Sequence, residues 1–192
     1  MTTTKTTTDS PSFSLTAFTA EGDTKLIKII TLNDGVVQKA APASLYKGTY
    51  KTYELTSLEK LNNGLDELDE NQALCIGVPL HDSKGDIVSR GSEREGAITR
   101  TKDNFKFSTC FIFDIDNSSL AIDEVIPELC KVDPRLATAN ILVRPSSSYG
   151  ISIEGEQPDL NSCGYHVWIC GIKEPSDIER YGKAFAKRCW LK

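Results

Sequence analysis

Residues 107–117, FSTCFIFDIDN, alternate between apolar and other side chains with the period of two that indicates a β-strand. One face is almost entirely apolar and is predicted to be buried, whereas the other face ends in Asp114 and Asp116. Residues two apart on a strand have Cα atoms roughly 6.5–7 Å from each other, so the two carboxylates lie side by side. Like charges this close repel each other, and a divalent cation between them removes that cost. The pair is therefore a candidate site for Mg²⁺ or Mn²⁺.

The length and composition of the chain indicate a soluble globular protein. Its 192 residues can form one large hydrophobic core, with room for a small second lobe. Hydrophobic residues make up 39% and charged residues 26%, which is ordinary for this class. Because no apolar run approaches the ~20 residues of a membrane-spanning helix, we expect no membrane association. The N-terminus lacks the apolar core of a secretory signal, which predicts a cytoplasmic protein.

The net charge and the cysteine content indicate which kinds of binding site the protein can contain. The net charge of −5 argues against a protein coated by nucleic acid, but it leaves room for a local basic groove. The six cysteines include no CxxC pair and fit reduced, buried thiols better than a disulfide framework. An alternative is a zinc site built from Cys163, His166, Cys170 and Cys189, whose ligand types suit zinc although their spacing is not that of a finger or ribbon.

Strand and helix patterns are interleaved along the chain, which predicts an α/β or α+β fold. The Thr- and Ser-rich residues 1–23 have little to bury and are expected to be a disordered tail. Asp123 is predicted to cap a helix in which Pro127 falls in the first turn. Further strands are predicted over residues 25–32, 73–80, 139–143 and 165–172, and helices over residues 56–68, 123–131 and from a capping box at 176–179 onward.

Two clusters near the predicted strands could meet a phosphate. The stretch before the aspartates carries Arg100 and Lys102, which form either a solvated loop or a phosphate contact. The strand over residues 139–143 leads into Arg144, which is followed by the hydroxyls of Ser146, Ser147 and Ser148. Hydroxyls and backbone N–H groups can cradle phosphates, and an arginine can neutralise developing charge.

His166 adds a third feature on a later strand, because it shares a face with Trp168 and Cys170. A histidine can donate a hydrogen bond to a phosphate oxygen. Carboxylates that hold metal ions allow those ions to bridge phosphate oxygens and to activate an attacking hydroxyl. The aspartate pair, the Ser-rich turn and the histidine together predict triphosphate chemistry.

The segments FIFDIDN, RPSSSYGI and GYHVWI, in this order, resemble the archaeo-eukaryotic primase superfamily. They are most similar to the primase-polymerase domains that are fused to helicases in phages, plasmids and integrative elements. The first motif of that family is an apolar run into D-x-D, which Asp114 and Asp116 match. Its second motif is a small residue, any residue and then His, which residues 164–166 match. The resemblance covers roughly residues 97–190.

This resemblance implies an RRM-like catalytic sheet over residues 97–192 and an N-terminal α/β lobe over residues 24–96. It implies template-directed nucleotidyl transfer by a DNA primase/polymerase, with Asp114 and Asp116 holding Mg²⁺ or Mn²⁺ and His166 contacting the triphosphate. The implied partners are nucleoside triphosphates, a single-stranded or primed DNA template and a fused or associated helicase in a prokaryotic cell. The third motif of the family, an acidic residue on a later strand, is expected beyond Lys192.

Two further interpretations stay open. FIFDIDNSSL also resembles the first motif of haloacid-dehalogenase-type phosphatases, in which the first aspartate is a nucleophile. Those enzymes usually have Gly-Thr after the second aspartate, where this chain has Asn117-Ser118. The chain could instead be a module of the primase fold that binds nucleic acid or nucleotide without turnover, which the lack of a third acid would favour.

Overall fold

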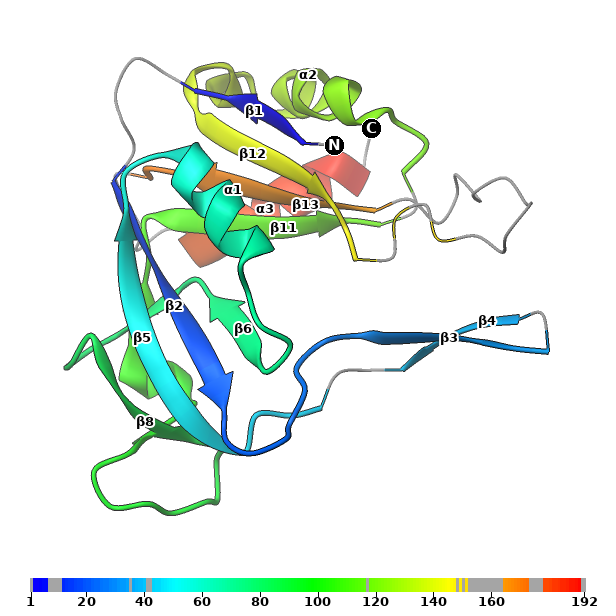
Figure 1. Ribbon diagram of the computed structural model, residues 1–192. Coiled ribbons are helices and arrows are strands. Elements are labelled where there is room, and N and C mark those ends of the chain that lie inside the picture. The colour runs from blue at the N-terminus through cyan, green and yellow to red at the C-terminus, as the bar shows by residue number, and fades with distance from the viewer. Residues whose placement is uncertain are drawn as a thin grey trace. The chain divides into compact units, whose positions relative to one another are not determined.

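The chain forms a mixed α/β fold of two compact units in this computed structural model. Unit 1 comprises residues 1–13, 56–59 and 109–192, and unit 2 comprises residues 14–55 and 60–108. The structure describes residues 2–6, 12–34, 36–40, 43–116, 118–147, 149, 151, 164–172 and 178–190, except for the side chains of residues 36, 37 and 190. Figure 1 shows the fold of the chain as a ribbon diagram.

Unit 1 contains a four-stranded antiparallel sheet in the order β1-β12-β13-β11. Its strands are β1 (Thr3–Lys5), β11 (Cys110–Ile115), β12 (Asn140–Pro145) and β13 (Tyr165–Cys170). Because β11 and β12 both run antiparallel to β13, their carboxyl ends lie at the same end of the sheet, beside the start of β13. The residues that leave β11 and β12 and those that enter β13 are therefore gathered at one end.

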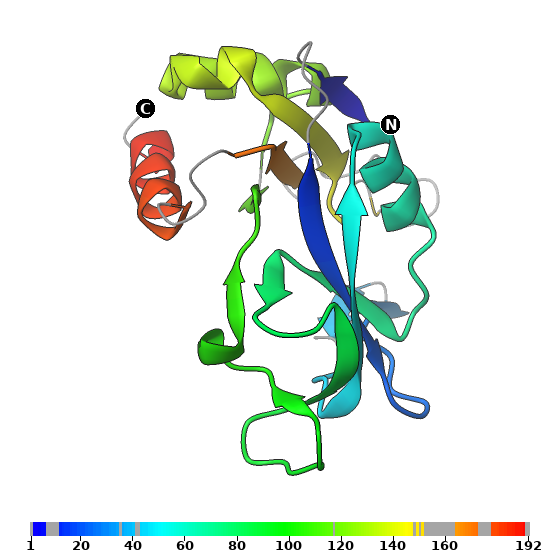
Figure 2. The ribbon, with the colours of Figure 1, turned by 90° about the vertical axis from the view of Figure 1, so that its left-hand side faces the viewer.

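Two helices cover one face of this sheet. They are α2 (Ile122–Val132) and α3 (Ile178–Trp190), and the 3₁₀ helix η2 (Pro134–Thr138) follows α2 (Figure 2). The core contains Val125 of α2, Phe185 of α3 and the central Val167 of β13, and all three are buried. On β13 the core side chains are Tyr165, Val167 and Ile169, as their alternation predicts, so His166 points to the opposite face.

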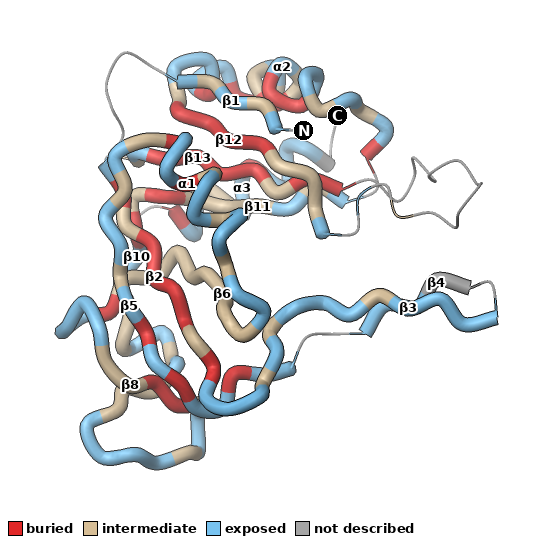
Figure 3. Tube along the Cα trace, in the orientation of Figure 1, coloured by how far each residue is buried: buried red, intermediate tan, exposed pale blue. Residues whose placement is uncertain are grey.

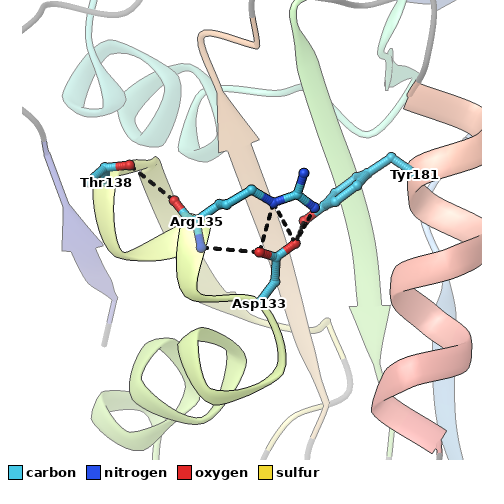
Figure 4. Close-up of polar contacts among 4 residues, drawn as sticks. All are labelled: Asp133, Arg135, Thr138 and Tyr181. Atoms are coloured by element: carbon cyan, nitrogen blue, oxygen red, sulfur yellow. Dashed lines mark hydrogen bonds and ion pairs between the residues drawn. The ribbon is translucent and has the colours of Figure 1, made fainter.

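A buried carboxylate joins η2 to α3 (Figure 4). Asp133 is 2% exposed and accepts hydrogen bonds from the Arg135 guanidinium, at 2.9 Å from Nε to Oδ1 and 2.6 Å from Nη2 to Oδ2. The Tyr181 hydroxyl of α3 donates to the same carboxylate at 3.1 Å. Hydrogen bonds from Arg135 hold the pKa of Asp133 at about 2, below its ordinary value, and burial together with this carboxylate raises the pKa of Tyr181 to about 12.

Unit 2 is built on a five-stranded sheet in the order β6-β2-β5-β8-β9, and the two-stranded sheet β10-β7 lies in the same unit. Its core contains Phe18, Tyr50 and Ile87, and Phe105 packs edge-on against Phe18. The helix α1 begins at the boundary between the units. The elements are β2 (Phe13–Ala20), β5 (Lys47–Leu55), α1 (Leu58–Asp66), β6 (Gln72–Cys75), β7 (Gly77–Pro79), β8 (Lys84–Val88), β9 (Ile98–Thr99), η1 (Lys102–Asn104) and β10 (Phe105–Phe107).

A separate two-stranded ribbon also belongs to unit 2. It consists of β3 (Ile29–Asn33) and β4 (Val36–Ala40), which pair with each other in antiparallel register. Asp34, in the turn between them, has a positive φ of 50°. In Figure 3 the described part of this ribbon is mostly exposed, in contrast to the buried segments of β2 and β5.

The prediction of a disordered tail over residues 1–23 is wrong for β1 and β2. Phe13, Leu15 and Phe18 of β2 are each at most 6% exposed. Thr16 between them is fully buried, and its hydroxyl donates to the Gly77 carbonyl at 2.7 Å. A threonine whose hydroxyl is satisfied is well suited to a buried strand, because its β-branched side chain is stiff. The polar composition therefore concealed a core strand.

The strand predicted over residues 107–117 is two strands in different units. Phe107 ends β10 in unit 2 and is 43% exposed, whereas β11 begins at Cys110 in unit 1. One of the places where the chain passes between the units lies between residues 108 and 109. The division into lobes at residues 96 and 97, which the resemblance implies, stays a prediction. The apolar run over residues 73–80 is likewise divided, into β6 and β7 of two different sheets. The alternation did predict correctly which side chains of β11 face the core.

The predicted helices exist, with different boundary details. The N-cap of α2 is Ala121, not Asp123, and its backbone N–H donates to the Glu124 carboxylate at 2.8 Å. Pro127 lies inside α2 beyond the first turn, so the helix lacks one backbone hydrogen bond there. The strand predicted over residues 25–32 is shorter and begins at Ile29. Residues 176 and 177 of the predicted capping box lie outside the described residues.

Candidate functional site

Three predicted site residues form one row across the sheet of unit 1. Asp114 of β11 lies directly opposite His166 of β13, and Arg144 of β12 lies opposite His166 on its other side. The ladder therefore aligns a carboxylate, an imidazole and a guanidinium that are far apart in the sequence. Their neighbours in the strands, such as Val143 and Val167, point into the core, so the row lies on the face away from α2 and α3.

Asp114 and His166 form a long-range polar pair that is open to solvent. Oδ1 of Asp114 is 3.7 Å from Nε2 of His166, which is longer than a hydrogen bond but short enough for an ion pair when the imidazole is protonated. The side chain of Asp114 is 64% exposed and that of His166 is 40% exposed. An exposed carboxylate that is not held tightly can still accept a further cationic partner.

The end of the sheet brings the remaining predicted residues of unit 1 close to this row. Asp116 is exposed and follows β11 directly. The backbone N–H of Ser146, which follows β12, donates to the Gly164 carbonyl at 2.8 Å. The Ser146 carbonyl accepts from the backbone N–H of Tyr149 at 3.0 Å, which closes a turn that contains the exposed Ser147. Ser148 lies outside the described residues.

Gly164 explains how the three chain segments can approach so closely. A Cβ atom at this position would lie 3.0 Å from the Ile115 carbonyl oxygen and 3.1 Å from Ser146 Oγ. A larger residue would push apart the exits of β11 and β12 from the start of β13. The sequence motif identified a small residue here, but its packing role is visible only in the structure.

Arg100 and Lys102 belong to unit 2 rather than to the unit that contains the row. The backbone N–H of Arg100 donates to the Val88 carbonyl at 2.8 Å, just after β9, and Lys102 begins η1. The prediction that they contact a phosphate stays a prediction.

The described residues were compared for groups of side chains that could bind a metal ion together. No group of three or more His, Cys, Asp and Glu side chains is placed to hold a metal ion in that part of the chain. The zinc alternative finds no support there: Sγ of Cys170 is 3.4 Å from Sγ of Cys110, Cys189 is exposed on α3, and Cys163 lies outside the described residues.

The arrangement suits an anionic ligand that brings its own metal ion. Mg²⁺ is commonly held by one or two carboxylates together with substrate phosphates and water, so a site of that kind does not require a third protein ligand. That Asp114 and Asp116 hold such an ion stays a prediction. Arg144 and His166 on the same face can donate hydrogen bonds to phosphate oxygens, since an arginine and a histidine both carry N–H donors.

Comparison of the chain with protein-family models, with curated proteins and with solved structures found no significant match. In the described part of the chain, no helix has the length and apolar character needed to cross a membrane.

Proposed function

We propose that this chain is the nucleotide-binding part of a DNA primase-polymerase of the archaeo-eukaryotic primase superfamily, which joins nucleotides on a DNA template with Mg²⁺ or Mn²⁺. The observation that carries this proposal is the row formed by Asp114, His166 and Arg144. Residues from three separate motifs, chosen from the sequence for phosphate and metal chemistry, form one row on the sheet face away from α2 and α3, with His166 between Asp114 and Arg144.

The order of elements in unit 1 supports the proposal. The succession β11, α2, β12, β13, α3 corresponds to the first five elements of a β-α-β-β-α-β unit, and β13 lies between β11 and β12. An RRM-like sheet has the same order for its first five elements, which supports the proposal. The sheet differs from an RRM-like sheet in one feature of its strands, which is the additional strand β1 beside β12.

Each residue of the row has a role in the proposed reaction. Asp114 and Asp116 would hold the divalent ion, which supplies charge neutralisation of the phosphates and activation of the attacking hydroxyl. His166 donates a hydrogen bond to a phosphate oxygen of the incoming nucleotide, and Arg144 stabilises the negative charge that develops there. Ser146 and Ser147 in the adjoining turn offer hydroxyls to the same triphosphate.

The test is calorimetric titration of the full chain with a nucleoside triphosphate, with and without Mn²⁺. We expect metal-dependent binding that Asp114→Asn and His166→Ala both remove. Asp123→Asn is the matched control, because Asp123 is an exposed carboxylate on α2 in the same unit. Loss of binding in the control as well, or no loss in Asp114→Asn, would refute the role of the row.

A second candidate is a module of the same fold that binds nucleotide without turnover. It is favoured by the finding that the described residues offer no group of three metal ligands. A primer-extension assay with Mn²⁺ separates the two, because the binding module retains triphosphate affinity but extends nothing. Release of phosphate from an aryl phosphate, lost in Asp114→Asn, would instead indicate the phosphatase interpretation.

A further inference from the structure

The β3–β4 ribbon is a surface of unit 2 that the proposed active site does not use. In the described residues its two strands pair only with each other, and the five-stranded sheet contains neither (Figure 1). Two-stranded ribbons are marginally stable in water. This one exposes two large apolar side chains on opposite faces, Ile29 at 49% and Leu32 at 54%. Covering either side chain with a partner would be favourable.

One face of the ribbon is basic near its base and apolar near its tip. Ile30 lies opposite Lys39, and Leu32 lies opposite Val37 nearer the turn. Lys28 directly precedes β3, at the base of the ribbon. Lys28 and Lys39 are both exposed, and neither has an ion-pair partner among the described residues.

The other face of the ribbon is polar near the tip. Thr31 lies opposite Gln38, and the Asn33 side-chain amide donates to the Gln38 side-chain oxygen at 3.0 Å. Each of these amides retains donor and acceptor capacity beyond this one bond. Asn and Gln side chains are also the groups that pair with adenine in the major groove.

The charge of the β3–β4 ribbon indicates which class of partner it binds. Between residues 28 and 40 the sequence has two lysines and a single acidic residue, Asp34 at the turn. A two-fold interface between copies of the chain would place this basic face against itself, which like charges disfavour. A phosphate backbone complements the lysines, and proteins that bind nucleic acid place apolar side chains such as Leu against base steps. The major groove, ≈ 12 Å wide, admits a two-stranded ribbon.

We propose that the β3–β4 ribbon is a DNA-binding arm that enters a groove of duplex DNA, with Lys28 and Lys39 on phosphates and Leu32 against the bases. The inference rests on the proposed function for the choice of DNA as the nucleic acid. It adds a second contact, outside the nucleotide site, that holds the double-stranded part of a primed template.

The test is fluorescence anisotropy of the full chain with a labelled duplex of about 20 base pairs, between about 50 and 200 mM salt. Lys28→Gln/Lys39→Gln should bind about tenfold more weakly at the lower salt concentration, and the slope of log affinity against log salt should fall by about 2. Lys47→Gln/Lys84→Gln is the matched control, since it removes two exposed lysines of the same unit from β5 and β8. The control should leave the slope unchanged.

Leu32→Ser tests the apolar tip without changing charge, and it should weaken binding while the salt slope stays the same. Protection of residues 28–34 and 38–40 from hydrogen exchange on addition of duplex is the second expected result. Circular dichroism melting of each variant establishes that it is folded.

The proposal is overturned if the wild type does not bind duplex, or if both lysine pairs lower affinity equally. It is also overturned if sedimentation shows a dimer that Leu32→Ser dissociates.

The results that would refute the DNA-binding arm differ from those that would refute the proposed nucleotide site. Asp114→Asn should bind duplex DNA as the wild type does, and Lys28→Gln/Lys39→Gln should retain metal-dependent triphosphate binding. Loss of duplex affinity in Asp114→Asn would place the DNA contact at the row and so refute the arm. A wild-type chain that binds duplex DNA but no nucleoside triphosphate leaves the arm standing and refutes the proposed function.

Discussion

Asp114 and His166 lie directly opposite each other on neighbouring antiparallel strands, with 3.7 Å between Asp114 Oδ1 and His166 Nε2. Arg144 occupies the next position of the same row, beyond His166. In the function that we propose, the carboxylate holds a metal ion while the two nitrogen-bearing side chains contact a phosphate. This separation of tasks within one row makes the contributions of the three side chains distinguishable by experiment.

Substitution of Arg144 should affect triphosphate binding differently from substitution of Asp114. Arg144→Gln removes a charge-assisted hydrogen-bond donor, so it should weaken binding about tenfold both with and without Mn²⁺. Asp114→Asn should remove only the metal-dependent part of the binding. Calorimetric titrations of the two variants, with and without Mn²⁺, check this. Identical metal dependence in the two variants would contradict the separation of roles.

Gly164→Ala should disturb the end of the sheet where the site lies. Its Cβ would lie 3.0 Å from the Ile115 carbonyl oxygen and 3.1 Å from Ser146 Oγ, so one of these neighbours must move. We expect a loss of about 1–2 kcal/mol of unfolding free energy, as for other overpacked sites, and weaker triphosphate binding. Urea denaturation and titration measure the two effects. Wild-type values for both would show that the close approach is unimportant.

Two helical glycines should respond in opposite directions to the same change. Gly64→Ala in α1 meets no atom within 4 Å and should stabilise the chain by about 0.5–1 kcal/mol, since alanine favours a helix. Gly182→Ala in α3 would place its Cβ 2.7 Å from the Phe111 ring, which also packs against Tyr181. There the clash should outweigh the propensity gain and destabilise by about 1–3 kcal/mol. Thermal melting of both variants provides the comparison, and equal shifts of the same sign would contradict it.

Asp133→Asn should lower stability in a pH-dependent way. The folded-state pKa of Asp133 is about 2, below the unfolded value of 3.8, so its contribution is complete above about pH 4 and is lost as the pH falls toward 2. The difference from the wild type should be about 2 kcal/mol at neutral pH and should shrink at acidic pH. Urea titrations at neutral and acidic pH test this. A difference that stays constant below pH 4 would show that the charge of Asp133 is not responsible.

The thiols should differ in reactivity toward an alkylating reagent. Cys110 and Cys170 are buried against each other, and the contact with Cys110 together with burial raises the pKa of Cys170. Cys189 is exposed on α3. Under native conditions Cys189 should be modified first, whereas Cys110 and Cys170 should react only after denaturation. Peptide mass spectrometry identifies the modified residues, and rapid native labelling of Cys170 would contradict this arrangement.

The faces of the site strands could be predicted from the sequence, whereas their register could not. Alternation places Asp114 and His166 on the polar sides of β11 and β13, because each neighbouring apolar residue must face the core. Which residue of β13 lies opposite Asp114 depends on pairing between segments more than fifty residues apart in the chain. No local pattern encodes that pairing, so the row appears only in the folded structure.

The sequence interpretation failed where composition concealed a buried strand. Residues 13–20 contain one serine, two threonines and two alanines beside their three large apolar side chains, and their composition continues that of the polar tail before them. In the structure, Thr16 of this strand is completely buried because its hydroxyl has a carbonyl partner. Conversely, Phe107 continued the apolar alternation of β11 but is 43% exposed and belongs to the other unit. In both cases, contacts with residues distant in the sequence decided whether the side chain is buried or exposed.

The pairing of β1 with β12 has a consequence for the order in which the chain folds. During synthesis, Thr3–Lys5 leave the ribosome well before their partners Ile141–Val143 have been translated. The segment between them contains all of unit 2, which can therefore fold first while β1 is still unpaired. Closing such a long loop is entropically costly and slows folding. The strand β1, which is synthesised before the other described strands, is thus among the last to find its place, and completion of unit 1 is the step that we expect to limit the maturation of the newly made protein.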